Sequence, residues 1–124
     1  MLKIVVFAAG LAGLAGVAAA EDVVTGSAVY RERIAMPENA VFVAELVERL
    51  SGDIVAGMRR EKAGNPPYAF RIVYDPAKIE DRLGYGVRAS VLVDGTPVFT
   101  TIDMPDVITR GAPREVMIVM RKAP

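Results

Sequence analysis

The sequence has 124 residues, in which 15 lysine and arginine side chains balance 15 aspartate and glutamate side chains, and it contains no histidine, cysteine or tryptophan. This length predicts one small domain. The absence of histidine and cysteine excludes an imidazole base, a thiolate nucleophile, a disulfide and a zinc site built from these residues, and the balanced charge argues against nucleic acid as a partner.

Residues 1–20 are typical of a secretory signal peptide. Lys3 provides the positive charge before an uncharged, apolar run, and Ala18 and Ala20 fit the small-residue positions at a cleavage site. We expect cleavage after Ala20, so that the exported chain begins at Glu21. The alternative is an uncleaved membrane anchor, but the run is short for a spanning helix and is interrupted by three glycines.

Removal of the signal peptide leaves 104 residues, Glu21–Pro124, which we expect to form one domain. This part carries 15 acidic and 14 basic side chains, so its net charge is 14 − 15 = −1. A domain of this size buries enough surface to fold without disulfides. The expected location is the periplasm, where disulfides are permitted but not required. There the protein is expected to be soluble, with no stable membrane anchor after cleavage.

The first strand of the exported chain is expected at Val23–Tyr30, and an ambiguous segment follows it. Residues 37–51 include apolar side chains at 40, 43, 44, 47 and 50, with a proline at the start and a glycine just past the end. This is helical spacing with helix-end residues. As a strand, the same segment places Phe42, Ala44 and Leu46 on one face and benefits from its Val-Phe-Val run. The local sequence does not decide between strand and helix.

Alternation of apolar and polar residues predicts the remaining strands. In Tyr68–Tyr74 and Tyr85–Val93 every second side chain is apolar, which is the period of a half-buried strand. Further strands are expected at Ile54–Arg59, Thr96–Ile102 and Glu115–Arg121, with turn residues between them. About seven short strands separated by turns predict an all-β fold, a small sandwich or barrel.

The Asp94-Gly95 pair between two of these runs is the strongest short signal for a β-hairpin. A strict two-residue turn would place Val91 opposite Val98. A three-residue loop with a bulge would place Val91 opposite Phe99 and would bury the larger side chain. Because a shift of one residue turns every side chain to the other face, we expect the bulged register.

Tyr85 is expected to have a structural role. It begins a predicted strand and stands six residues after Ile79, a pattern that is similar to the tyrosine corner of Greek-key sandwiches. In such a corner the ring packs inside and the hydroxyl forms a hydrogen bond with the backbone upstream. We therefore expect Tyr85 and Ile79 to stabilise the fold.

Two groups of acidic residues are the nearest approach to a catalytic pair, Glu80 with Asp81 and Asp103 with Asp106. A glycosidase needs two carboxylates across a cleft, one of them with a raised pKa. Both groups stand among polar and turn residues, where aspartate commonly stabilises a turn. No catalytic, metal-binding or cofactor-binding residue is predicted. A small carboxylate-dependent hydrolase or glycan-acting enzyme is the alternative to a binding protein.

Four stretches, taken in order, span nearly the whole exported chain. They are Val24–Pro37; Pro67–Pro76; Tyr85–Ala89 with Asp94–Gly95 and Phe99–Thr101; and Val107–Pro113. Together they resemble the YbaY/YscW family, whose members are described as type III secretion lipoprotein chaperones or pilotins. The resemblance implies an extracytoplasmic β-sandwich of immunoglobulin-like or prealbumin-like type, in which the ambiguous segment is a strand.

The same resemblance implies a role as a pilotin or chaperone for an outer-membrane secretin. Many relatives carry a lipobox that ends in cysteine, whereas Val17–Ala20 contains none. We therefore expect a non-enzymatic, soluble periplasmic binding or chaperone-like protein whose partner is an envelope or secretion-system protein. An extended segment of that partner could add to an open sheet edge. We expect Val23–Tyr30 to be this edge, since terminal strands often lie at sheet margins, and Ala28→Pro to weaken binding there.

Overall fold

The computed structural model describes residues 21–124, so the predicted signal peptide, including Ala18 and Ala20, lies outside the described residues. Glu21 is the first described residue and is exposed. The strands are β2 (Asp22–Tyr30), β3 (Val41–Glu48), β4 (Ile54–Arg60), β5 (Tyr68–Tyr74), β6 (Tyr85–Val93), β7 (Thr96–Thr101), β8 (Asp106–Val107) and β9 (Glu115–Lys122), with one turn of 3-10 helix, η3 (Pro76–Lys78), after β5. Within residues 21–124 no helix is long and apolar enough to cross a membrane.

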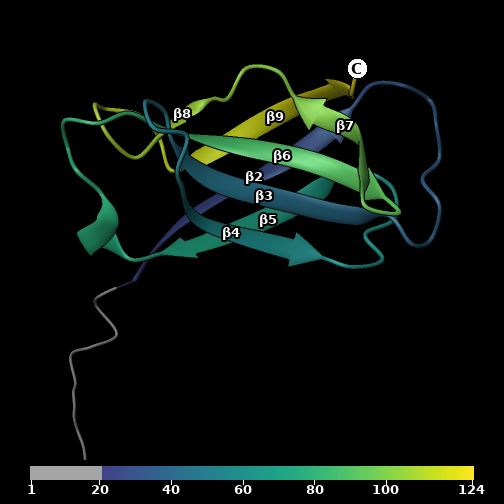
Figure 1. Cartoon of the computed structure of the whole chain (residues 1–124), viewed down its shortest axis with the longest axis horizontal. Coiled ribbons are helices and arrows are strands. Elements are labelled where there is room, and N and C mark those ends of the chain that lie inside the picture. Colours follow the sequence, from purple (N-terminus) through teal and green to yellow (C-terminus); the bar gives the residue numbers. More distant parts are fainter. Residues whose placement is uncertain (1–20) are drawn as a thin grey trace, which may run out of the picture.

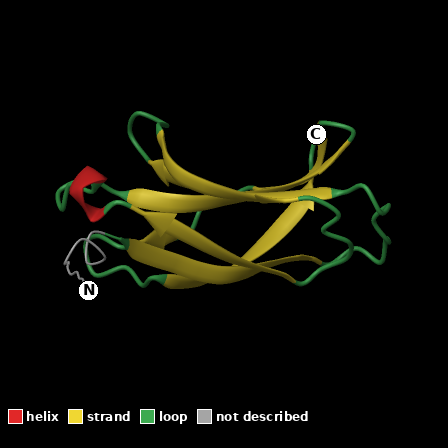
Figure 2. Cartoon of the chain, turned by 90° about the horizontal axis from the view of Figure 1, so that it is seen from below, coloured by secondary structure: helices red, strands yellow, loops and turns green. Residues whose placement is uncertain are grey.

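All eight strands of residues 21–124 belong to one hydrogen-bonded sheet in the order β4-β3-β6-β7-β9-β2-β5, with β8 paired to β6 off this path. The pairs are antiparallel except β2 with β9, which is parallel. The sheet curls until β4 and β5, its two ends, lie near each other without pairing (Figure 1). Two layers therefore face one another (Figure 2). The all-β class is confirmed, but the pairing does not divide the strands into the two separate sheets of a sandwich.

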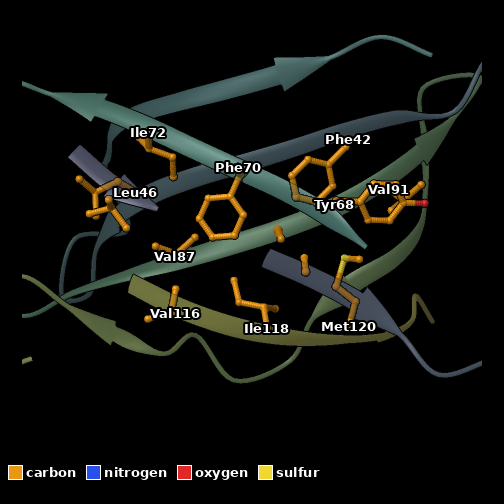
Figure 3. Close-up of a cluster of buried hydrophobic side chains, with 14 of the residues drawn as sticks. Phe42, Leu46, Tyr68, Phe70, Ile72, Val87, Val91, Val116, Ile118 and Met120 are labelled. Atoms are coloured by element: carbon orange, nitrogen blue, oxygen red, sulfur yellow. The ribbon is translucent and has the colours of Figure 1, made fainter. Parts of the chain in front are cut away.

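The core lies between the two layers and is filled by every second side chain of the strands. In β5 the buried residues alternate strictly with exposed ones. Figure 3 shows side chains of β3, β5, β6 and β9 pointing toward one another in this space. At its centre the Phe42 ring stacks on Tyr68, with a centroid distance of 4.9 Å and an angle of 11° between the ring planes. Burial of such aromatic rings is a large share of the free energy of folding.

The ambiguous segment forms strand β3, as the resemblance implies. Phe42, Ala44 and Leu46 are completely buried, which is the set that the strand interpretation predicts. β3 pairs with β4 along one edge and with β6 along the other. These long-range pairings outweigh the helical spacing of the local sequence.

Gly26, in the middle of β2, lies where the backbone of β9 and a core side chain both come very close to the strand. A Cβ atom added there would overlap the carbonyl oxygen of Val116 on β9 and would lie 2.6 Å from Cζ of Phe70. The absence of a side chain thus lets β9 lie beside β2 and lets the Phe70 ring lie over the strand.

The β6–β7 hairpin has the expected pair, Val91 opposite Phe99. Asp94 and Gly95 both have positive φ angles, 51° and 80°, as a two-residue type I′ turn requires. The turn is therefore short, and the extra residue is Val98 within β7. The prediction of the register is right, but the bulge lies inside the strand and not in the loop.

The prediction that the first strand is a free edge is wrong. β2 lies between β9 and β5, and Ala28 is opposite Ile118 on one side and Tyr68 on the other. The C-terminal strand returns to cover β2, and no local sequence signal indicates such a pairing. Ala28→Pro would therefore disturb a central strand instead of testing an edge. β8, a two-residue strand, was also not predicted.

Candidate interaction site

The two strands at the ends of the sheet path each leave one edge without a strand partner in the part of the chain that the structure describes. β4 pairs with β3, and β5 pairs with β2. Unpaired strand edges expose backbone N–H and C=O groups that can pair with another chain. We call these the β4 edge and the β5 edge.

The bonds of neighbouring strands determine which backbone groups point out of the β4 edge. The N–H of Ala89 on β6 donates to Oγ1 of Thr101 (2.9 Å), and the same hydroxyl donates to the Ala89 carbonyl (3.1 Å). These groups thus face β7. In an antiparallel sheet, the backbone groups of successive residues point to opposite sides of the strand. The direction at Ala89, together with the registers of β6 with β3 and of β3 with β4, therefore gives the direction of the backbone groups on β4. The N–H and C=O groups of Gly57 and Arg59 therefore point away from β3, whereas Val55 is the extra residue at a shift of register between β3 and β4.

The same reasoning applies to the β5 edge. The N–H of Thr25 on β2 donates to the carbonyl of Arg114 (2.9 Å), so it faces β9. The backbone groups of β2 that face β5 are then those of the residues on either side of Thr25 and every second residue from there. From the register of β2 with β5, the backbone groups that point away from β2 are those of Ala69, Arg71 and Val73.

Arg60 distinguishes the two edges. Its Nη2 donates to the carbonyl oxygen of Ala69 on β5, and its guanidinium lies 6.0 Å from the centre of the Phe42 ring. The arginine thus crosses from β4 to β5 and occupies one acceptor of the β5 edge. The β4 edge has no such contact among the described residues, and Ile54 at its start is 54% exposed. The β4 edge is therefore the better candidate for pairing with another chain.

Three tyrosine hydroxyls connect the core to loops. The Tyr85 hydroxyl oxygen accepts a hydrogen bond from the Glu80 N–H (3.0 Å), and Ile79 is half-buried against the core. The hydroxyl of Tyr30 donates to the carbonyl of Ile34 (2.6 Å), and that of Tyr68 donates to the carbonyl of Gly64 (2.8 Å). The stabilising role of Tyr85 and Ile79 as a tyrosine corner stays a prediction.

Burial affects the acidity of the tyrosines in the core. It raises the pKa of Tyr30, Tyr68 and Tyr74 above the ordinary value of 10.0, because the phenolate is disfavoured away from water. The hydroxyl of Tyr74 is buried and has no hydrogen-bond partner among residues 21–124.

The acidic residues do not form a catalytic pair. Glu80 forms an ion pair with Arg82 (3.0 Å), and Asp106 forms one with Arg49 (2.6 Å). All 15 aspartates and glutamates of the chain lie within residues 21–124, and none of them is buried. No group of three or more acidic residues that could hold a metal ion occurs in this part of the chain. A carboxyl group in a buried site, as the catalytic acid of a glycosidase requires, is therefore not found among these residues.

Comparison with known proteins identifies a matching family and a similar solved structure. The family model described as type III secretion system lipoprotein chaperone (YscW) matches residues 19–120. Among solved structures, an alternative pilotin from the type II secretion system of Vibrio cholerae has a TM-score of 0.74 and 32% sequence identity, and the match covers 83% of this chain and 99% of that chain. A search of curated proteins finds no match. Both descriptions are of chaperone-type proteins and not of enzymes.

Proposed function

Because the chain belongs to the family of type III secretion system lipoprotein chaperones (YscW), we propose that it is a soluble periplasmic pilotin-like chaperone for a component of a secretion system. The resemblance of residues 1–20 to a signal peptide supports an exported location. The family consists of chaperone-type proteins, so the protein is a binding protein and not an enzyme. No observation favours the alternative of a carboxylate-dependent hydrolase.

The partner that we propose is an outer-membrane secretin or another envelope protein of the secretion system. The family takes its description from lipoproteins, in which an acylated cysteine is the anchor, whereas none of the 124 residues here is a cysteine. We therefore propose that the protein meets its partner from the periplasm and without an acyl chain of its own.

The β4 edge is the surface that we propose for this partner. An extended segment can add to a sheet as a further strand, with affinity from backbone hydrogen bonds and specificity from alternate side chains. Gly57 and Arg59 offer outward-pointing backbone groups along this edge, whereas Arg60 already occupies part of the β5 edge. The observation that carries the proposal is this difference between the two ends of the sheet, together with the family of the chain.

Proline substitution tests the proposal because it removes one backbone N–H. Arg59→Pro removes an outward N–H from the β4 edge, and an edge strand accepts proline where its N–H faces solvent. We expect it to lower capture of the secretion component about tenfold, the effect of one lost hydrogen bond of about 1.4 kcal/mol. The measurement is affinity capture by the purified exported protein from solubilised envelopes of the source bacterium, with identification by mass spectrometry.

Two matched variants separate the backbone from other effects. Arg59→Ala removes the charge but keeps the N–H, and Val73→Pro makes the same backbone change on the β5 edge. Both should capture the partner as the unchanged protein does, and circular dichroism should show that all variants are folded. Equal capture by a folded Arg59→Pro variant would refute the β4 edge as the site. Capture of no secretion component by the unchanged protein would refute the proposed function itself.

A further inference from the structure

The outward face of β9, β2 and β5 has few charges and several exposed apolar side chains. On β9, Met117 and Val119 are 73% and 42% exposed, and on β5, Val73 is 39% exposed. The outward residues of the central strand β2 are small or β-branched, and they are half-buried: Val23, Thr25, Ser27 and Val29. We call this surface the apolar face. Exposed apolar patches on a small protein commonly mark an interaction site.

Two opposite charges lie symmetrically on the apolar face. Thr25 is opposite Glu115 on β9 and opposite Arg71 on β5. Since neighbouring strands are about 4.8 Å apart, the two charged residues stand at equal distances from Thr25 on either side. Both are exposed, and neither forms an ion pair with another of residues 21–124.

The next row of the apolar face pairs a large side chain with a small one. Ser27 is opposite Met117 on β9 and opposite Ala69 on β5. A protruding methionine and a flat alanine thus flank β2 at equal distances. In each row the two residues that flank β2 are complementary to each other, acidic with basic in one row and large with small in the next. A second copy with its β9 and β5 sides exchanged therefore presents a complementary residue at each of these positions.

We propose that the apolar face binds a second copy of this chain, with the two-fold axis parallel to β2 and in the plane of contact. Rotation about this axis places β9 of one copy over β5 of the other. Glu115 then meets Arg71 of the second copy, and Met117 meets its Ala69, and each contact occurs twice. The rotation leaves the strand direction unchanged, which agrees with aligned packing of sheets about 10 Å apart.

The apolar face also has room for the charged side chains of the second copy. A shallow hollow of about 680 Å³ lies over the start of β2, and its lining includes Val23, Thr25, Arg71, Val73 and Glu115. Long side chains that enter it from the second copy can form charge-assisted hydrogen bonds while the surrounding valines are covered. The β4 edge is not part of this face, so the dimer and the proposed chaperone function do not depend on each other.

Charge exchange tests the proposed dimer. Sedimentation velocity of the purified exported protein, over a concentration series up to high micromolar, should show a reversible dimer. Arg71→Glu places a second carboxylate opposite Glu115 of the other copy at both contacts, and we expect the dimer dissociation constant to rise at least tenfold. The double variant Arg71→Glu with Glu115→Arg exchanges the two charges and should restore dimerisation. Arg59→Glu, which makes the same change on β4, should leave it unaltered.

Each outcome supports or overturns the dimer. A protein that is monomeric throughout the series overturns it. An unaltered dimer in the Arg71→Glu variant shows that another surface is used, and a double variant that stays as weak as the single one shows that these charges do not meet across a two-fold axis. Circular dichroism of each variant confirms that a weakened dimer is not an unfolded chain.

Discussion

The two outward faces of the curled sheet differ in how their polar groups are satisfied. On the face formed by β3, β6 and β7, which we call the polar face, Nε and Nη2 of Arg88 donate to Oε1 of Glu45 (3.1 and 2.8 Å). The hydroxyls of Ser90 and Thr100 form a hydrogen bond beside this pair (3.2 Å). On the apolar face the charged groups have no ion-pair partner within residues 21–124. These polar groups of the polar face are thus paired within one copy of the chain, whereas the charged groups of the apolar face are available for contact with another molecule.

The largest expected effect on stability tests which side chains of β9 face the core. Ile118 is 3% exposed and faces the core, whereas its neighbour Met117 faces outward. Ile118→Ala should reduce the free energy of unfolding by about 3 kcal/mol, and Met117→Ala should change it by less than about 0.5 kcal/mol in dilute protein. Urea denaturation measures both. Similar losses in the two variants would show that the alternation on β9, and with it the apolar face, is wrongly assigned.

The next effect concerns the interior that both faces share. The pKa values of Tyr30, Tyr68 and Tyr74 are raised in the folded protein, so the unfolded chain loses the phenolic protons first. The contribution of these three tyrosines to the free energy of unfolding should therefore be complete below about pH 10 and should decrease as the pH rises above that value. The urea midpoint between about pH 8 and pH 11 measures this decrease, which Tyr68→Phe should make less steep. A midpoint independent of pH in this range would contradict the burial of these hydroxyls.

A smaller effect concerns the start of β6, a strand of the polar face. Tyr85→Phe removes the acceptor of the Glu80 N–H and should reduce the free energy of unfolding by about 1 kcal/mol. Thermal or urea unfolding at neutral pH measures this. No change in stability would show that Tyr85 is not a stabilising tyrosine corner.

The smallest effect compares the charges of the two faces directly. Alanine substitutions of Glu45 and Arg88, made singly and together, should give a coupling energy of about 0.5 kcal/mol, because the ion pair is partly exposed to solvent. The same cycle for Arg71 and Glu115, in protein dilute enough to be monomeric, should give no coupling. Equal coupling in the two cycles would remove the contrast between the faces.

Local sequence was sufficient for much of the fold. The alternation in Tyr68–Tyr74 and Tyr85–Val93 predicted both strands with their observed bounds. The pair of Val91 with Phe99 followed from the need to bury the larger side chain. For β3 the residues alone left two structures open, because Ala44 suits the buried face of a helix as well as that of a strand, and it is buried in the structure.

The candidate site could not be located from local sequence, because edges are set by pairings between distant residues. Nothing in Glu115–Lys122 indicates that it returns parallel to β2, so local sequence wrongly predicts an edge at the first strand. Gly26 was the available signal, since a glycine inside a strand suggests the close approach of another backbone. The contact of Arg60 with Ala69, which separates the β4 edge from the β5 edge, likewise depends on the curl of the sheet.

Single cysteines test the contrast between the faces most directly, because the chain has no cysteine of its own. Ser27 lies in the middle of the apolar face, close to the proposed two-fold axis, and Ser90 lies on the polar face. After treatment with a bismaleimide that spans about 10 Å, the distance between packed sheets, we predict covalent dimers of the Ser27→Cys variant and monomers of the Ser90→Cys variant. Equal cross-linking of the two, or dimers of Ser90→Cys alone, would contradict the conclusion that the apolar face is the one that associates.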